Sequence, residues 1–219
     1  MLPIPGSSHK DGEGNGCLMH RHHRSFVNVP TARCVPLSDP QQLAPDQFGI
    51  VALRELRKAG FDASPLRRER RSSLPGEEDA YRIDYQLSLA VPGADAPLDI
   101  LIECRRQGAP VGKSEVESLR ERAEENEITA AMLFATSGYS KEAAVHACAN
   151  GIALFRVADG RAAWTRSAWG GPSVPSWIPE FMLELAVLGP TGDVRYDLIQ
   201  AGHAGKVLER LTPSPQSGP

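Results

Sequence analysis

LDILIECRRQ (residues 98–107) is a mostly apolar run that Glu103 and Arg105 interrupt. The run has the length and composition of a buried strand, in which alternate side chains lie on one face. Glu103 and Arg105 are two positions apart, so they share a face, with Cα atoms about 6–7 Å apart. Because charged groups are costly to bury unless they are paired or used, this face of the strand predicts a functional site.

The preceding segment, residues 81–91, alternates almost perfectly between apolar and polar side chains. Such alternation predicts a half-buried strand with Asp84 on its polar face. The turn-forming sequence PGAD at residues 92–95 joins the two strands, which indicates an antiparallel hairpin. Paired strands lie about 4.8 Å apart, so a suitable register brings Asp84 close to Glu103 and Arg105. Two neighbouring carboxylates suit a hard divalent cation such as Mg²⁺.

Downstream of the hairpin, helical and strand patterns alternate. The sequence SEVE at residues 114–117 has the pattern of a capping box and predicts the start of a helix. A buried strand is expected at 130–135, then a helix that Ser140 caps and Gly151 ends, then a buried strand at 152–157. This order implies parallel pairing with right-handed crossovers, so the chain as a whole predicts an α/β domain with a mixed central sheet.

The domain boundaries are inferred from composition. Residues 1–43 are rich in Gly, Pro, Ser and His without periodicity, which predicts a disordered arm. A helix that begins near Pro45 opens the folded domain, which is expected over 44–160. All three tryptophans lie in residues 161–211, which we interpret as a small C-terminal appendage that covers a sheet edge or contacts a second subunit. Residues 212–219 form a tail.

Composition narrows the class of protein. The net charge of −3 is not that of a globally basic nucleic-acid-binding protein, although it allows a local basic patch. The four cysteines are scattered without a CxxC pair, and no secretory signal is seen, so a reducing, cytoplasmic setting is expected. No run of about 18 apolar residues is present, so no membrane span is expected.

Taken in order along the chain, these features resemble the restriction-endonuclease-like superfamily, and within it the Mrr-type catalytic domain. The resemblance covers roughly residues 45–157. The motifs that carry it are Phe48, RKAGF at 57–61, Asp84, ECR at 103–105, PVGK at 110–113, ATSGYS at 135–140 and GIAL at 151–154.

The resemblance implies a three-layer α/β/α fold and a metal-dependent DNA endonuclease of the kind used in bacterial restriction or phage defence. By resemblance, Asp84 and Glu103 bind Mg²⁺ or Mn²⁺, and position 105 carries the family's catalytic lysine. This chain has Arg105 there, and arginine stays protonated, so it can hold a phosphate oxygen or stabilise transition-state charge but cannot act as a general base. Gly49 is a second departure, because relatives often carry glutamate after the position of Phe48.

Several further residues are candidates for contact with DNA. They are Arg67, Arg68, Arg70, Arg71, Arg106, Lys113 and Gln86. The cations among them are of the type that contacts phosphates and gives salt-sensitive affinity, and the alternative interpretation is an ordinary solvated run of charge.

Two functions of other classes stay open at this point. One is a catalytically silent module of the same fold that binds DNA or a partner protein. The other makes the Trp-containing region an assembly surface through which the chain forms a homo-oligomer or binds a partner protein.

Overall fold

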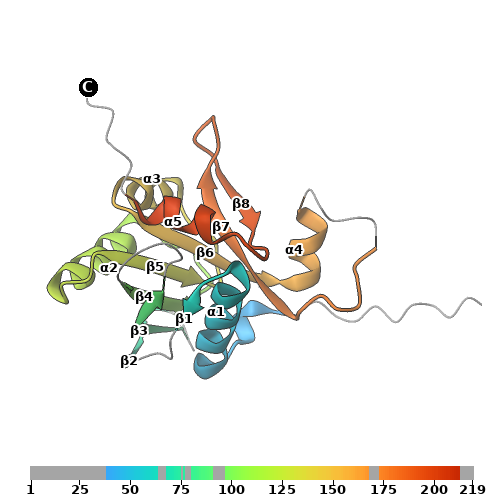
Figure 1. Ribbon diagram of the computed structural model, residues 1–219, viewed down its shortest axis with the longest axis horizontal. Helices are drawn as coiled ribbons and strands as arrows, with labels where there is room; N and C mark the ends of the chain where they lie inside the picture. Colours follow the sequence, from blue (N-terminus) through green and yellow to red (C-terminus); the bar gives the residue numbers. More distant parts are fainter. Residues whose placement is uncertain are drawn as a thin grey trace, which may run out of the picture. The chain divides into compact units, whose positions relative to one another are not determined.

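The computed structural model describes residues 38–63, 68–74, 76, 80–90, 97–167 and 173–212 (Figure 1). The strands in these ranges are β1 (Asp62–Ala63), β2 (Arg68–Ser73), β3 (Tyr81–Ala90), β4 (Leu98–Arg106), β5 (Ala130–Ala135), β6 (Ile152–Asp159), β7 (Phe181–Leu188) and β8 (Val194–Leu198). The helices are the short 3₁₀ helix η1 (Pro40–Gln42), α1 (Pro45–Ala59), α2 (Lys113–Glu125), α3 (Lys141–Ala149), α4 (Gly160–Arg166) and α5 (Ala204–Leu211). The described strands form an eight-stranded sheet in the order β1-β3-β4-β5-β6-β7-β8, and β2 also pairs with β3.

The sheet is mixed, as predicted. β3 and β4 pair antiparallel, which confirms the expected hairpin, and the register makes Asp84 the Cα partner of Glu103. The predicted turn at residues 92–95 lies outside the described residues. β4, β5 and β6 pair in parallel, and β7 and β8 continue the sheet in antiparallel orientation. Helices α2 and α3 supply the crossovers between the parallel strands.

Helices cover both faces of this sheet (Figure 1). On one face, Phe48 and Leu56 of α1 and Val207 of α5 join a buried cluster with apolar side chains of β3 to β7. On the other face, Leu119 of α2 and Ala147 of α3 belong to a second buried cluster. The architecture is therefore the predicted three-layer α/β/α arrangement.

The helix ends follow local chemistry. Gly60 ends α1 with a φ of +110° that glycine adopts without strain. The predicted start of α2 was wrong by two residues, because Gly112 and not Ser114 is the N-cap. The side chain of Glu115 accepts the N–H of Gly112 at 3.1 Å, whereas the hydroxyl of Ser114 donates to Glu115 instead of capping the helix.

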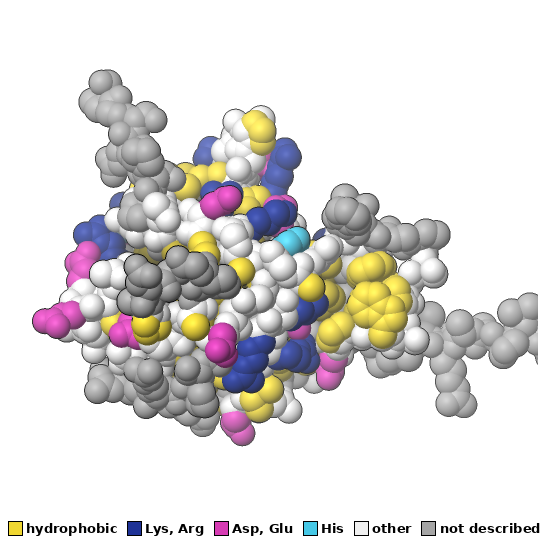
Figure 2. Space-filling model, viewed as in Figure 1, with side chains coloured by type: hydrophobic (Ala, Val, Ile, Leu, Met, Phe, Trp, Pro, Cys, Tyr) yellow, Lys and Arg dark blue, Asp and Glu magenta, His cyan; other side chains and the backbone are white. Residues whose placement is uncertain are grey.

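The segment predicted as a C-terminal appendage, residues 161–211, contributes β7 and β8 to the same sheet and α5 to the layer that holds α1. Two of its tryptophans, Trp164 of α4 and Trp177, meet edge to face with ring centroids 5.6 Å apart, and Trp169 lies outside the described residues. Trp177 is 66% exposed. Figure 2 shows a group of apolar side chains on the side of the molecule where α4 lies in Figure 1.

The end of the predicted N-terminal arm, residues 38–43, contacts the domain. Leu43 is buried, and the hydroxyl of Tyr81 donates to the Leu43 carbonyl at 2.8 Å. The rest of the arm, residues 1–37, and the tail at 213–219 lie outside the described residues. In the part of the chain that the structure describes, no helix has the length and apolar character needed to cross a membrane.

Candidate functional site

Two carboxylates lie side by side where β3 and β4 pair. Asp84 and Glu103 are partners in the antiparallel register. Their neighbours along each strand, such as Ile83 and Cys104, enter the core that α1 covers, so the carboxylates lie on the opposite face, toward α2. Glu103 is fully buried and Asp84 is 8% exposed. The fold thus brings together the two residues that the sequence predicts as metal ligands.

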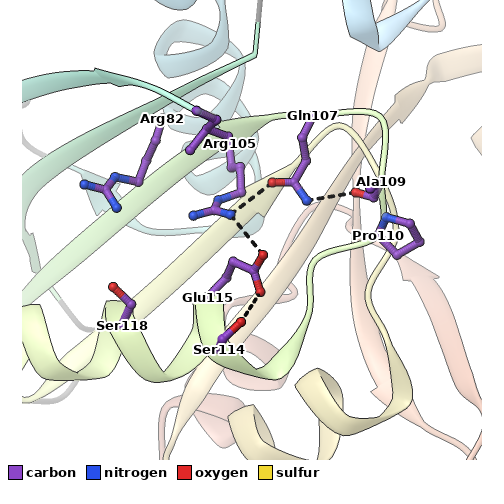
Figure 3. A pocket seen from close by; sticks show the side chains of 9 residues that line it. Arg82, Arg105, Gln107, Ala109, Pro110, Ser114, Glu115 and Ser118 are labelled. Carbon is purple, nitrogen blue, oxygen red and sulfur yellow. Dashed lines mark hydrogen bonds and ion pairs between the residues drawn. The ribbon is translucent and has the colours of Figure 1, made fainter. Parts of the chain in front are cut away.

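Arg105 lies next to Glu103 on the same face of β4 and is itself buried. Its Nε donates to Glu103 Oε1 at 2.8 Å, and its Nη1 donates to Gln107 Oε1 at 3.0 Å. The same Nη1 lies 3.5 Å from Glu115 Oε1, a carboxylate of the first turn of α2. Figure 3 shows Arg105 reaching toward Gln107 on one side and Glu115 on the other. The predicted active-site cation is therefore held in place by three side chains.

A second arginine, which sequence reasoning missed, reaches the same carboxylates from α2. Nη2 of Arg122 donates to Glu103 Oε2 and lies 3.5 Å from Asp84 Oδ1. Nη1 of the same guanidinium donates to Ser118 Oγ at 2.7 Å, one helical turn earlier. The sequence signal that could have found Arg122 is its position on the helix. Ser118 and Arg122 flank the apolar stripe of α2 that contains Leu119, and this stripe faces the sheet.

Three guanidiniums surround Asp84 and Glu103. Arg82 adds a third guanidinium, with Nε 3.7 Å from Asp84 Oδ2. Burial raises the pKa of the Glu103 carboxyl above its ordinary value, and the adjacent Arg105 and Arg122 guanidiniums oppose that shift. Among the described residues, three buried atoms of this cluster have no hydrogen-bond partner: Asp84 Oδ1, Arg82 Nε and Arg122 Nε. Such unsatisfied buried groups are uncommon in native proteins and call for an explanation.

Two pockets open beside the cluster. The larger, of about 460 Å³, is lined by Arg82, Arg105, Gln107, Ser114, Glu115 and Ser118 together with Leu74, Ala109 and Pro110 (Figure 3). The smaller, of about 110 Å³, is lined by Asp84, Gln86 and Arg122, with other side chains of β3, β4 and α2. Small ligands therefore reach Asp84 from one side and the Arg105 guanidinium from the other, whereas Glu103 lines neither pocket.

The remaining candidates for DNA contact are scattered. Gln86 lies in the smaller pocket with Asp84, so the structure brings these two together. Arg106 does not join the site, because it follows Arg105 and so lies on the other face of β4, with its guanidinium 5.7 Å from the centre of the Tyr81 ring. Lys113 pairs with the exposed Glu117 at 3.1 Å.

The arginine run before β3 is described only in part. Arg67 lies outside the described residues, as do the side chains of Arg68, Arg70 and Arg71. The backbone register of β2 makes Arg70 the Cα partner of Asp84.

The carboxylates are the hard oxygen donors that Mg²⁺ and Mn²⁺ prefer, and Mg²⁺ commonly uses one or two protein carboxylates and keeps several water ligands. Asp84 and Glu103 supply such donors, and Asp84 Oδ1, which is within ion-pair range of Arg122 but accepts no hydrogen bond among the described residues, offers a lone pair. Among the described residues, no group of three or more His, Cys, Asp and Glu side chains is arranged to hold a metal ion. By donor chemistry the pair suits a divalent cation with two protein ligands, and in this structure Arg105 and Arg122 donate to both oxygens of Glu103.

A family model described as "Restriction endonuclease" (Mrr_cat) matches residues 40–159, more than half of the chain. The matched segment runs from η1 to the end of β6 and contains Asp84, Glu103 and Arg105 as well as Arg122. Comparison with curated proteins found no match, and comparison with solved structures found none either.

Proposed function

The chain belongs to the Mrr-type restriction endonuclease family, and on that premise we propose that it hydrolyses DNA phosphodiester bonds with the help of a divalent metal ion. Family membership establishes a nuclease domain of the restriction-endonuclease type, for which DNA is the substrate. The observation that carries the finer proposal is the register of the hairpin, which makes Asp84 and Glu103 direct partners beside Arg105.

In this proposal Asp84 and Glu103 hold Mg²⁺ or Mn²⁺ through their carboxylate oxygens. When bound, such an ion stabilises negative charge on the phosphate and makes water a stronger nucleophile at neutral pH. The two carboxylates come from paired interior strands of the sheet, so the strand register sets their spacing before substrate arrives.

Arg105 has the role of phosphate ligand. A guanidinium has five N–H donors, and the bonds to Glu103 and Gln107 use two of them. Gln107 is itself held by its Nε2, which donates to the Ala109 carbonyl at 2.8 Å, so the guanidinium is fixed at the wall of the larger pocket. A fixed cation at this position favours the charge that develops on a phosphate during in-line displacement. It takes no proton, because arginine is always protonated.

One observation favours a second candidate function. Both oxygens of Glu103 accept hydrogen bonds from guanidiniums, Oε1 from Arg105 and Oε2 from Arg122, and arginine replaces the family's lysine at position 105. If these contacts persist, Glu103 has no oxygen left for a metal ion, and the guanidiniums bind a DNA phosphate without hydrolysis of the phosphodiester bond. The chain would then be a catalytically silent module that binds DNA.

We also propose where the protein acts and what it contacts. We expect the protein to act in the cytoplasm, in restriction or phage defence, because DNA is the substrate of the family. Residues 38–43 of the expected arm pack on the folded domain, so we propose a separate segment only for the residues before them. The exposed Trp177 beside Trp164 supports a contact with a second copy or a partner protein through the C-terminal region.

The test uses purified protein with methylated and unmethylated plasmid DNA, in Mg²⁺, in Mn²⁺ and in chelator. Cleavage should require metal and be lost in Asp84→Asn and in Glu103→Gln, while DNA affinity measured by fluorescence anisotropy is largely kept. Glu209→Gln is the matched control, because Glu209 is an exposed carboxylate on α5, on the opposite face of the sheet. A folded protein that binds both DNAs and cuts neither would favour the silent module.

A further inference from the structure

One atom of Arg122 lies between the two carboxylates. Nη2 contacts Glu103 Oε2 and is 3.5 Å from Asp84 Oδ1, so a single positive group bridges residues of two paired strands. A cation held by both carboxylates would compete with Arg122 for these oxygens. The bridging charge comes from α2, an element that lies above the hairpin on the carboxylate face.

The bridge leaves both partners partly unsatisfied. Arg122 Nε is buried and has no hydrogen-bond partner among the described residues, and the same is true of Asp84 Oδ1. A guanidinium built permanently into this position would be expected to satisfy both, because fork-shaped pairing with carboxylates is the strength of arginine. Arg122 therefore donates a hydrogen bond to Glu103 but makes only an ion pair with Asp84. A lone pair of Asp84 Oδ1 stays available to another ligand.

Arg122 and a divalent cation cannot both bridge the carboxylates. Two positive groups that share the same two oxygens repel strongly at such short range, and more so in a buried site. Glu103 nevertheless keeps a counterion when Arg122 leaves, because Arg105 still donates to Oε1 at 2.8 Å. The fully buried carboxylate is thus never left without compensation, which would be severely destabilising.

The structure also provides a place for the displaced guanidinium. Arg122 lines the smaller pocket, and Glu125 lines it too, three residues later on α2. Side chains at this spacing are neighbours on a helix surface, so Glu125 is an acceptor that Arg122 reaches by rotation of its side chain alone.

We propose that Arg122 is a built-in counterion that occupies the cation position between Asp84 and Glu103, and that a divalent cation binds only by displacing it. The inference rests on the proposed metal-binding role of these two carboxylates. It makes Arg122 a regulator of metal affinity: the site stays closed at low metal concentration and opens as the concentration rises.

The first test is calorimetric titration of the full-length protein with Mn²⁺ alone. Arg122→Gln should bind Mn²⁺ at least tenfold more tightly than the unaltered protein, and Asp84→Asn introduced into that variant should abolish the gain. Arg120→Gln is the matched control: it removes the same charge from the same helix, but Arg120 pairs with Glu124 and Asn150 and not with the site. Equal affinity of Arg122→Gln and Arg120→Gln, or no binding by either, would overturn the proposal.

A second measurement needs no variant at position 122. In nitrogen-15 spectra of the unaltered protein, the Nε–H signal of Arg122 should shift saturably as Mg²⁺ is added, while that of Arg120 stays in place. An Arg122 signal that does not move in excess Mg²⁺ contradicts displacement.

These readouts separate the inference from the nuclease proposal. Tighter Mn²⁺ binding by Arg122→Gln without plasmid cleavage by any form would support the inference and refute the nuclease. Metal-dependent cleavage with unchanged Mn²⁺ affinity in Arg122→Gln would support the nuclease proposal and refute the displacement of Arg122.

Discussion

Asp84 and Glu103 are opposite one another in the β3–β4 register and share one guanidinium, that of Arg122. The pair is therefore part of the packing between the hairpin and α2, as well as a candidate metal site. Substitutions at the pair act on folding and on chemistry together.

Removal of the Glu103 carboxylate should destabilise the fold. Glu103→Ala leaves Arg105 and Arg122 without their shared counterion in a buried position, and loss of one partner from such a pair costs about 3–5 kcal/mol. Urea unfolding followed by circular dichroism measures the change. Glu103→Gln should lose less, because the amide oxygen still accepts one of the two hydrogen bonds.

The corresponding control is Glu209→Ala. Glu209 is exposed on α5, and surface substitutions of this kind change the free energy of unfolding by no more than about 0.5 kcal/mol. A Glu103→Ala protein as stable as this control would show that the buried charges are not coupled.

Arg105 should matter to the rate of cleavage more than to binding. Loss of a donor that stabilises transition-state charge typically slows a reaction about 10²–10³-fold, and we expect this for Arg105→Ala in single-turnover assays with saturating metal. Arg105→Lys keeps the charge but not the fork that spans Glu103 and Gln107, so its rate should be intermediate. Arg195→Ala, on the β7–β8 hairpin, should cleave at the normal rate. An Arg105→Ala protein with full activity would exclude the proposed role.

Phe134 should be among the most sensitive positions of the core. Its ring stacks on that of Phe155 with centroids 4.7 Å apart, and both side chains are fully buried. Phe134→Ala creates a cavity between α1 and the sheet, which typically costs about 3–5 kcal/mol. Ile50→Ala removes an exposed side chain from α1 and should leave the unfolding midpoint in urea nearly unchanged.

Two helical glycines should respond in opposite directions to alanine. A Cβ on Gly160 would lie 1.8 Å from the Pro179 carbonyl oxygen, so Gly160→Ala has to move backbone and should destabilise by about 1–3 kcal/mol. A Cβ on Gly205 meets nothing within 4 Å, so Gly205→Ala should stabilise α5 by about 0.5–1 kcal/mol. Thermal unfolding shows whether each variant is more or less stable than the unaltered protein. A Gly160→Ala protein that unfolds at the same temperature as the unaltered protein would contradict the close packing of α4.

Asp193 should titrate at unusually low pH. Hydrogen bonds from Arg195, at 2.8 Å, and from the Thr191 hydroxyl lower the pKa of its carboxyl to about 2. Because the folded pKa lies below the unfolded value of about 3.9, the contribution to stability is complete above pH 4 or so and is lost as the pH falls toward 2. A carbon-13 titration of the carboxyl signal measures the midpoint. In Arg195→Gln it should rise toward the ordinary value, and an unchanged midpoint would exclude Arg195 as the cause.

Much of this site could be predicted because strand parity is visible in sequence. The apolar residues of 81–91 and 98–107 have to face one core, so Asp84 and Glu103 necessarily share the other face. The pairing of these two residues depended on the length and shape of the turn between the strands, which sequence patterns give only loosely. Family resemblance singled out the same two residues.

The sequence signalled the contribution of α2 only weakly, through the position of Arg122 beside the apolar stripe of that helix. Arg122 is one of several charged residues on that helix, and its contact with Glu103 depends on how α2 crosses the sheet. Similarly, FMLELAVL at 181–188 reads only as an apolar segment. In the structure it is the interior strand β7, and a strand covered on both faces lacks the alternation that identifies half-buried strands.

The strand order of the sheet also decides at which residue a fragment of this protein can end and still fold. The family match ends at residue 159, the last residue of β6, but the outer edge of β6 is paired along Phe155–Asp159 with β7. A protein cut at that boundary would leave this edge of β6 without its strand partner, and unpaired strand edges are surfaces on which chains associate. An expression plasmid therefore has to encode residues up to Leu211, which form β7, β8 and α5, if the domain is to fold without associating through this edge.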